Sequence, residues 1–127
     1  MKKCRIQIST ITDGNRQEIS REGEFLLLPR SAVLCYKEDA TQVTIRLDGE
    51  KALVERIGDY YLSLRLENGK TTEGILGIGG GEGKILSQTH EIEYRISERM
   101  LVLSLVYDLI FGEERQKMHL RLLAAEV

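Results

Sequence analysis

Apolar and polar residues alternate along most of the chain with the period of two that is typical of β-strands. The longest apolar run, Arg99–Ile110, contains no Gly or Pro and is rich in residues that favour a pleated sheet. Because successive strand side chains point to opposite faces, the alternate positions from Leu101 to Leu109 share one apolar face. Ser104 and Asp108 interrupt the other face. The run therefore predicts a central strand of a β core, and it is too short and too charged to span a bilayer as a helix.

The same alternation predicts nine or ten short strands that are separated by turn residues. Asp13-Gly14 and Asn68-Gly69 are strong signals for hairpin turns, because these residues tolerate positive φ. Arg115–Ala125 alternates like a strand but contains good helix formers, so a C-terminal helix stays open as the alternative. We expect strands over residues 2–12, 18–28, 32–38, 41–48, 51–57, 60–67, 71–76, 84–97, 99–110 and 115–125.

The short connections between these strands predict the fold. Two- and three-residue turns make neighbouring strands antiparallel, and a long meander removes its exposed edges by closing on itself. We therefore predict an all-β protein with a single domain over residues 1–127. The domain is a single antiparallel up-and-down meander closed into a β-barrel of about 8–10 strands, with a β-sandwich as the alternative.

Composition and charge narrow the class of partner. The net charge is −2 and the pI is about 5.8, with acidic and basic residues interspersed, so we predict no nucleic-acid binding. No apolar segment follows Lys2 and Lys3, so we expect a cytoplasmic protein without a signal peptide and without membrane insertion. Cys4 and Cys35 lack CxxC spacing, and we expect two buried free thiols, with a disulfide between them as the alternative.

A glycine-rich stretch, Gly77–Gly83, precedes Lys84. It does not fit a phosphate-binding loop, because Ile85 stands where a Walker A sequence needs Ser or Thr. It does not fit a dinucleotide fingerprint either, because Glu82 stands at a required glycine position. We expect no cofactor, and we interpret the stretch as a plain connector or a mobile flap over the barrel mouth.

Two polar residues fall on a mostly apolar face of the predicted strand 84–97. If that face looks into a barrel, Gln88 and His90 need partners or a ligand there. A register break near Glu91 or a satisfied core histidine would also explain them, and we favour these alternatives over a ligand contact. His119 falls on a polar face, where we expect it to be solvated. No second ligand stands at metal-site spacing and no nucleophile–base arrangement is visible, so we predict no metal site and no catalytic residue.

Four short patterns, taken in order, carry a family resemblance: Tyr36-x-Glu38, Arg56-x-Gly58, Thr89 and Tyr107-x-Leu109. Together they resemble the YwiB-like family of bacterial domains of unknown function. The resemblance implies a calycin-like (lipocalin-like) β-barrel and no established activity. Residues 74–80 depart from a Tyr-Thr-Pro-Tyr-Gly-like segment of that family, so the resemblance does not imply a shared ligand.

Three functional hypotheses follow. The first is non-catalytic binding of a small apolar or amphipathic ligand in the barrel. The second is a protein-interaction or self-associating module with a filled core, as a monomer or homodimer, which could use an uncovered edge near the glycine-rich stretch. The third, an enzyme with Glu38 or His90 as base, ranks last because neither has a visible activating partner. The residues that we expect to contact a ligand are Tyr36, Glu38, Arg56, Gln88, His90 and Tyr107.

Overall fold

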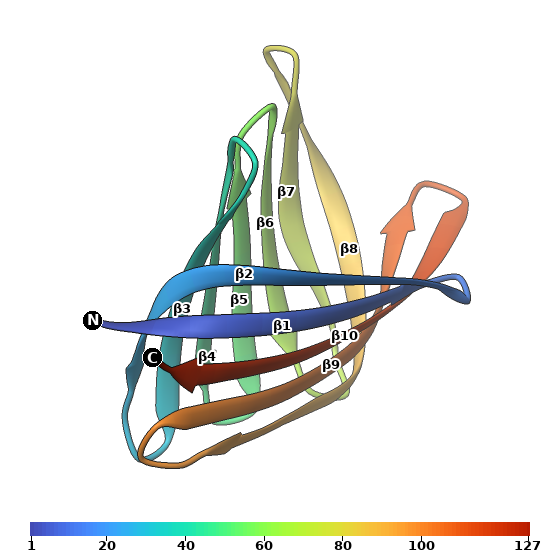
Figure 1. Ribbon diagram of the computed structural model, residues 1–127. Coiled ribbons are helices and arrows are strands. Elements are labelled where there is room, and N and C mark those ends of the chain that lie inside the picture. Colours follow the sequence, from blue (N-terminus) through green and yellow to red (C-terminus); the bar gives the residue numbers. More distant parts are fainter.

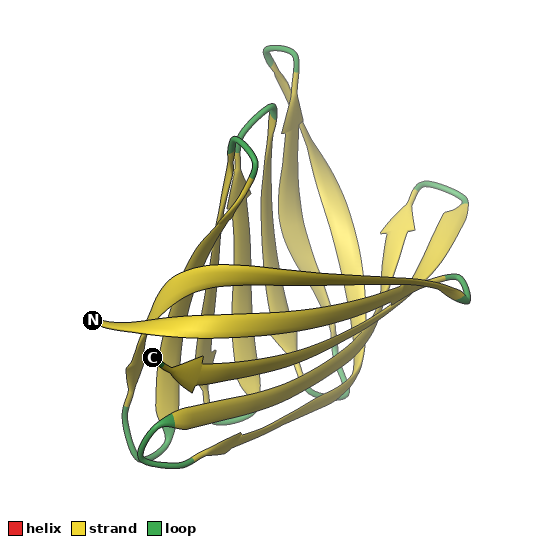
Figure 2. Ribbon diagram, in the orientation of Figure 1, coloured by secondary structure: helices red, strands yellow, loops and turns green.

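The structure, a computed structural model that describes residues 1–127, consists of ten β-strands and contains no helix (Figures 1 and 2). The strands lie close to the predicted segments, and the C-terminal segment is a strand rather than a helix. They are β1 (Lys2–Thr12), β2 (Asn15–Leu27), β3 (Ser31–Glu38), β4 (Thr41–Asp48), β5 (Lys51–Ile57), β6 (Tyr60–Glu67), β7 (Thr71–Ile78), β8 (Gly81–Ile96), β9 (Met100–Phe111) and β10 (Glu114–Glu126).

Every strand pairs antiparallel with its neighbours in sequence, and β1 pairs with β10 to close the barrel. The predicted up-and-down barrel is therefore confirmed. Gly14 and Gly69 take positive φ values of 86° and 75° in the two hairpin turns that the sequence predicted, a conformation that other residues rarely adopt. The structure contains no helix that is long and apolar enough to cross a membrane.

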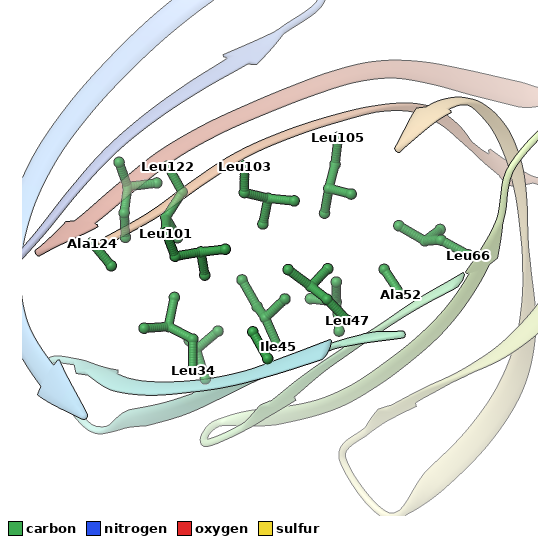
Figure 3. Packing of buried hydrophobic residues seen from close by; sticks show 14 of the residues in the cluster. Leu34, Ile45, Leu47, Ala52, Leu66, Leu101, Leu103, Leu105, Leu122 and Ala124 are labelled. Atoms are coloured by element: carbon green, nitrogen blue, oxygen red, sulfur yellow. The ribbon is translucent and has the colours of Figure 1, made fainter. Parts of the chain in front are cut away.

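The central strand is β9, which lies between β8 and β10. Leu101, Leu103 and Leu105 on its inner face are at most 1% exposed. They belong to a core of 23 buried residues that fills much of the barrel interior. Figure 3 shows the two facing walls of this core, with Leu34, Ile45, Leu47, Ala52 and Leu66 on one side and Leu101, Leu103, Leu105, Leu122 and Ala124 on the other.

The two ends of the barrel differ. We call the end with the β2–β3, β4–β5, β6–β7 and β8–β9 turns the closed end, because a tyrosine spans it. The Tyr94 hydroxyl lies 3.0 Å from the carbonyl oxygens of Arg30 and Gly49, which it links across the barrel. We call the opposite end the open end. It carries the other five hairpins, which Figure 1 shows projecting in two separate groups.

The glycine-rich stretch forms a paired hairpin at the open end rather than an unpaired connector. The β7–β8 ladder continues through Gly77–Glu82 and Ile78–Gly81, which leaves only Gly79 and Gly80 in the turn. Residues 81–85 of β8 pair with β7 alone, because the β8–β9 ladder begins only at the pair Leu86–Ile110. An uncovered edge next to this stretch, of the kind that the self-association hypothesis uses, is therefore present. Its hairpin is the uppermost one in Figure 1.

Both cysteines are free thiols in the structure. Cys4 is buried as expected, whereas Cys35 is only half-buried. Cys35 Sγ lies 3.8 Å from Thr44 Oγ1 on the neighbouring strand. Burial is the main cause that raises the pKa of the Cys4 thiol to about 11, so this thiol is inert at neutral pH.

Candidate functional site

Four of the six predicted ligand-contact residues meet inside the barrel near its open end. Tyr36 and Arg56 both pair with Val43 of β4, from opposite sides, so the three lie in one row across the inner wall. Glu38 lies one inward position closer to the open end, and Tyr107 comes from β9 on the facing wall. We call Tyr36, Glu38, Arg56, Tyr107 and Thr89 the inner cluster.

An ion pair holds the centre of the inner cluster. Arg56 Nη2 donates to Glu38 Oε2 at 2.9 Å, and each side chain is about one quarter exposed (25% and 23%). Such a partly buried charge is tolerable when an opposite charge faces it. Glu38 and Arg56 therefore satisfy each other's charge inside the barrel.

Two phenols flank this pair as neutral hydroxyl groups. Burial raises the pKa of Tyr36 strongly, and the charge of Glu38 raises it further against the opposing effect of Arg56. Burial also raises the pKa of Tyr107 to about 12, although Arg56 opposes it. At neutral pH both phenols can donate and accept hydrogen bonds without carrying charge.

Three buried polar atoms on the inner wall have no hydrogen-bond partner: Arg56 Nε, Thr89 Oγ1 and Ser87 Oγ. Thr89 pairs directly with Tyr107 across β8 and β9, so its hydroxyl belongs to the inner cluster. Unpartnered buried polar atoms are uncommon in folded proteins and call for an explanation such as a bound molecule. We did not expect Ser87 from the sequence, although its position two residues before Thr89 puts it on the same face.

The glycine of the Arg56-x-Gly58 pattern has a packing reason. A Cβ at Gly58 would lie 2.5 Å from Thr41 Oγ1 and 3.0 Å from Thr41 Cα. Only glycine allows β4 and β5 to come this close at the rim, where Glu38 pairs with Thr41. All four sequence patterns behind the family resemblance thus serve one region of the barrel.

The inner cluster is partly accessible from the open end. On the inner wall, Leu62 and Leu76 are half-buried, and one position further out Tyr60 and Ile78 are 37% and 63% exposed. Core leucines on the same wall nearer the closed end, such as Leu64 and Leu66, are 1% exposed. The partly exposed charged groups of Glu38 and Arg56 therefore lie beside partly exposed apolar side chains at this end.

The other two predicted residues, Gln88 and His90, are not in the lumen, so that expectation is wrong. A β-bulge between Thr89 and Glu91 shifts the register of β8 by one residue, which is the register break that the sequence analysis kept as an alternative. The bulge places Ser87 and Thr89 inward and leaves His90 on the outer face. Gln88 lies there too, where its Oε1 accepts a hydrogen bond from Arg115 at 2.7 Å.

These two residues form an outer cluster with Asp108 and Arg115. Asp108 Oδ2 lies 2.8 Å from Arg115 Nη1 and 3.2 Å from His90 Nε2, and its side chain is only 9% exposed. Burial acts to raise the pKa of Asp108, but hydrogen bonds from His90 and Arg115 outweigh it and hold this pKa below its usual range. Every member of the outer cluster has a partner.

A concavity of about 900 Å³ also lies on the outside of the barrel, across β8, β9, β10, β1 and β2. Within it, Ser104 Oγ lies 3.1 Å from His119 Nε2 and 3.4 Å from Glu91 Oε2. The half-buried His119 is therefore hydrogen-bonded rather than fully solvated as expected. Because the carboxylate contacts the serine and not the imidazole, nothing orients this histidine as a base. The network ties three strands together.

Comparison with known proteins supports the fold. A family model described as "Domain of unknown function (DUF1934)" matches residues 3–122. The crystal structure of the YwiB protein from Bacillus subtilis is similar, with a TM-score of 0.84 and 18% sequence identity, over 99% of this chain and 92% of that chain. No curated protein matches the sequence. A likeness at this identity supports the architecture and says nothing of a ligand.

Proposed function

The chain belongs to the DUF1934 family, as the resemblance to YwiB-like proteins predicted, and we propose that it binds a small amphipathic molecule at the open end of its barrel without catalysing a reaction. The observation that carries this proposal is the set of unpartnered polar atoms in the inner cluster. Arg56 Nε is buried beside the neutral phenols Tyr36 and Tyr107 near the open end. Thr89 Oγ1 is buried on the residue that pairs with Tyr107, at the level of the β6–β7 turn.

The shape of the interior limits where the ligand binds. Core side chains fill the barrel toward the closed end, so a deep lumen site is not available there. Toward the open end, the half-buried Leu62 and Leu76 offer apolar surface beside the polar groups of Tyr36 and Arg56. A ligand that fits has an apolar body against the leucines and a polar head near the inner cluster.

The same geometry supports binding rather than catalysis. Glu38, the one carboxylate in the inner cluster, already accepts a hydrogen bond from Arg56 at 2.9 Å. The raised pKa values of Tyr36 and Tyr107 make both phenols poor bases at neutral pH. A general base needs a pKa near the working pH, which neither phenol has, and the one carboxylate is held in an ion pair.

Native mass spectrometry of the freshly purified protein, compared with the denatured protein, tests this proposal. We expect an additional mass of a few hundred daltons, roughly that of a drug-sized ligand, which is lost on denaturation. The Arg56→Met variant should lose this mass, whereas His90→Ala, which changes the outer cluster, should keep it. A bare protein whose melting temperature no amphiphile raises would contradict the proposal.

A further inference from the structure

Three charged side chains face inward around the inner cluster: Arg21, Glu38 and Arg56. Glu38 and Arg56 neutralise each other in the ion pair of the inner cluster. Arg21, on β2, pairs with Ile6 of β1, whose side chain is completely buried in the core, so Arg21 points to the inner side as well. The sequence analysis did not identify it.

The position of Arg21 follows from where the β2–β3 ladder ends. The last pair is Gly23–Tyr36, so residues 15–22 of β2 pair with β1 alone and have no partner on the β3 side. Continuing the ladder by one inward position would place Arg21 opposite Glu38. Arg21 therefore lies at the rim of the open end, next to the inner cluster and beside an unpaired strand edge.

No carboxylate lies within salt-bridge distance of Arg21. Its one side-chain hydrogen bond is from Nη1 to the carbonyl oxygen of Ser20, at 2.9 Å. Arg16 on the outer face of the same strand differs, because it pairs with Glu18 at 3.8 Å. Arg21 thus carries a positive charge that no carboxylate of the protein contacts.

We propose that Arg21 receives the anionic head group of the ligand, so that the open end selects amphiphiles with one negative charge, such as alkyl carboxylates. This inference rests on the proposed function, since it names the class of ligand for the same site. A guanidinium can donate two parallel hydrogen bonds to a carboxylate, a geometry that neither an alcohol nor an amine can match. The half-buried apolar side chains of Leu62 and Leu76 then contact the alkyl chain.

The test is isothermal titration of the full chain with dodecanoate, dodecanol and dodecylamine, each below its critical micelle concentration. We expect dodecanoate to bind roughly tenfold tighter than dodecanol, as one charge-assisted interaction implies, and dodecylamine to bind weakest. If dodecanol binds as tightly as dodecanoate, the inference about charge is wrong and the proposed binding function stands. If none of the three binds, both fail.

Variants test whether Arg21 causes the preference for dodecanoate over dodecanol. Arg21→Gln should weaken dodecanoate binding about tenfold and leave dodecanol binding unchanged, while Arg21→Lys should keep most of the preference. Arg16→Gln removes the same charge from the outer face of the same strand, and it should change neither affinity. An equal loss in Arg16→Gln and Arg21→Gln would show a general charge effect and overturn the role of Arg21. Melting temperatures confirm that each variant is folded.

Discussion

The inner and outer clusters contain similar polar groups, but only those of the outer cluster all have hydrogen-bond partners. Each joins an arginine to a carboxylate at 2.8–2.9 Å, and each draws on β8 and β9. In the outer cluster, the buried Asp108 accepts hydrogen bonds from Arg115 and His90, and Gln88 accepts one from Arg115. In the inner cluster, Arg56 Nε and Thr89 Oγ1 have no partner.

This difference separates a structural polar group from a candidate binding group. Leaving a buried donor unpaired costs about 1–3 kcal/mol, so a fold tolerates it where something else offsets the cost. The outer cluster is complete within the protein, and we interpret it as a brace across β8, β9 and β10. The inner cluster is incomplete within the protein, and a ligand would complete it.

The largest stability effect should come from the brace. Asp108→Ala removes two charge-assisted hydrogen bonds from a nearly buried position, and we expect the free energy of unfolding to fall by about 2–3 kcal/mol. Because Arg115 and His90 are about half exposed (50% and 46%), water can solvate them once Asp108 is gone, which limits the loss. Urea denaturation measures the change. Ligand binding should be unaffected. If Asp108→Ala abolished binding, the outer cluster would not be purely structural.

Arg56→Met should have a smaller effect on stability and a larger one on binding. It leaves Glu38 without a partner but about one quarter exposed, so we expect a loss of about 1–2 kcal/mol. The double variant Arg56→Met/Glu38→Gln should recover most of this stability and still fail to bind ligand. Urea denaturation and native mass spectrometry, done on the same samples, test this pair of expectations. If the double variant bound ligand normally, the Glu38–Arg56 ion pair would have a structural role only.

The alternation of side chains allowed the barrel to be predicted, because short turns leave few ways to pair neighbouring strands. It also gave the inward faces of β3 and β5, which is why Tyr36, Glu38 and Arg56 were identified. The β-bulge at His90 defeated the same reasoning on β8. A bulge inserts one residue into an otherwise regular pattern, and residues 85–96 contain no glycine or proline to signal it.

Arg21 shows a second limit of the sequence. Counting back from Phe25 in steps of two places it inward, but a glycine inside a strand, such as Gly23, is also typical of a bulge or bend that would reverse this order. The register of β2 in fact runs unbroken through Gly23. Glycine stands there because a Cβ would collide with the carbonyl oxygen of Cys35. Where a ladder ends, and which charge is then left unpaired, depends on three-dimensional pairing that no local pattern records.

The two clusters should also respond to opposite ends of the pH scale. The lowered pKa of Asp108 gives stability that is complete above roughly pH 4, the unfolded value, and is lost as the pH falls through the folded value. The raised pKa of Tyr107, about 12, gives stability that is complete below about pH 10 and is lost as the pH rises toward 12. The melting temperature, plotted against pH, should fall less steeply at acid pH in Asp108→Asn and less steeply at alkaline pH in Tyr107→Phe. If one variant changed the curve at both ends, the two clusters would be coupled.

The smallest expected change in stability, that of Thr89→Val, tests the difference between the two clusters most directly. Thr89 is 1% exposed and its hydroxyl has no partner, so Thr89→Val exchanges a buried unpaired group for a methyl of similar shape. We expect the free energy of unfolding to stay the same or rise by up to about 1 kcal/mol, while ligand affinity falls. Ser104→Ala is the matched control, since it removes a hydroxyl bonded to His119 and should destabilise by about 1 kcal/mol. If Thr89→Val destabilised the protein as Ser104→Ala does, the inner hydroxyl would have a partner without any ligand, and the inner cluster would be a second brace.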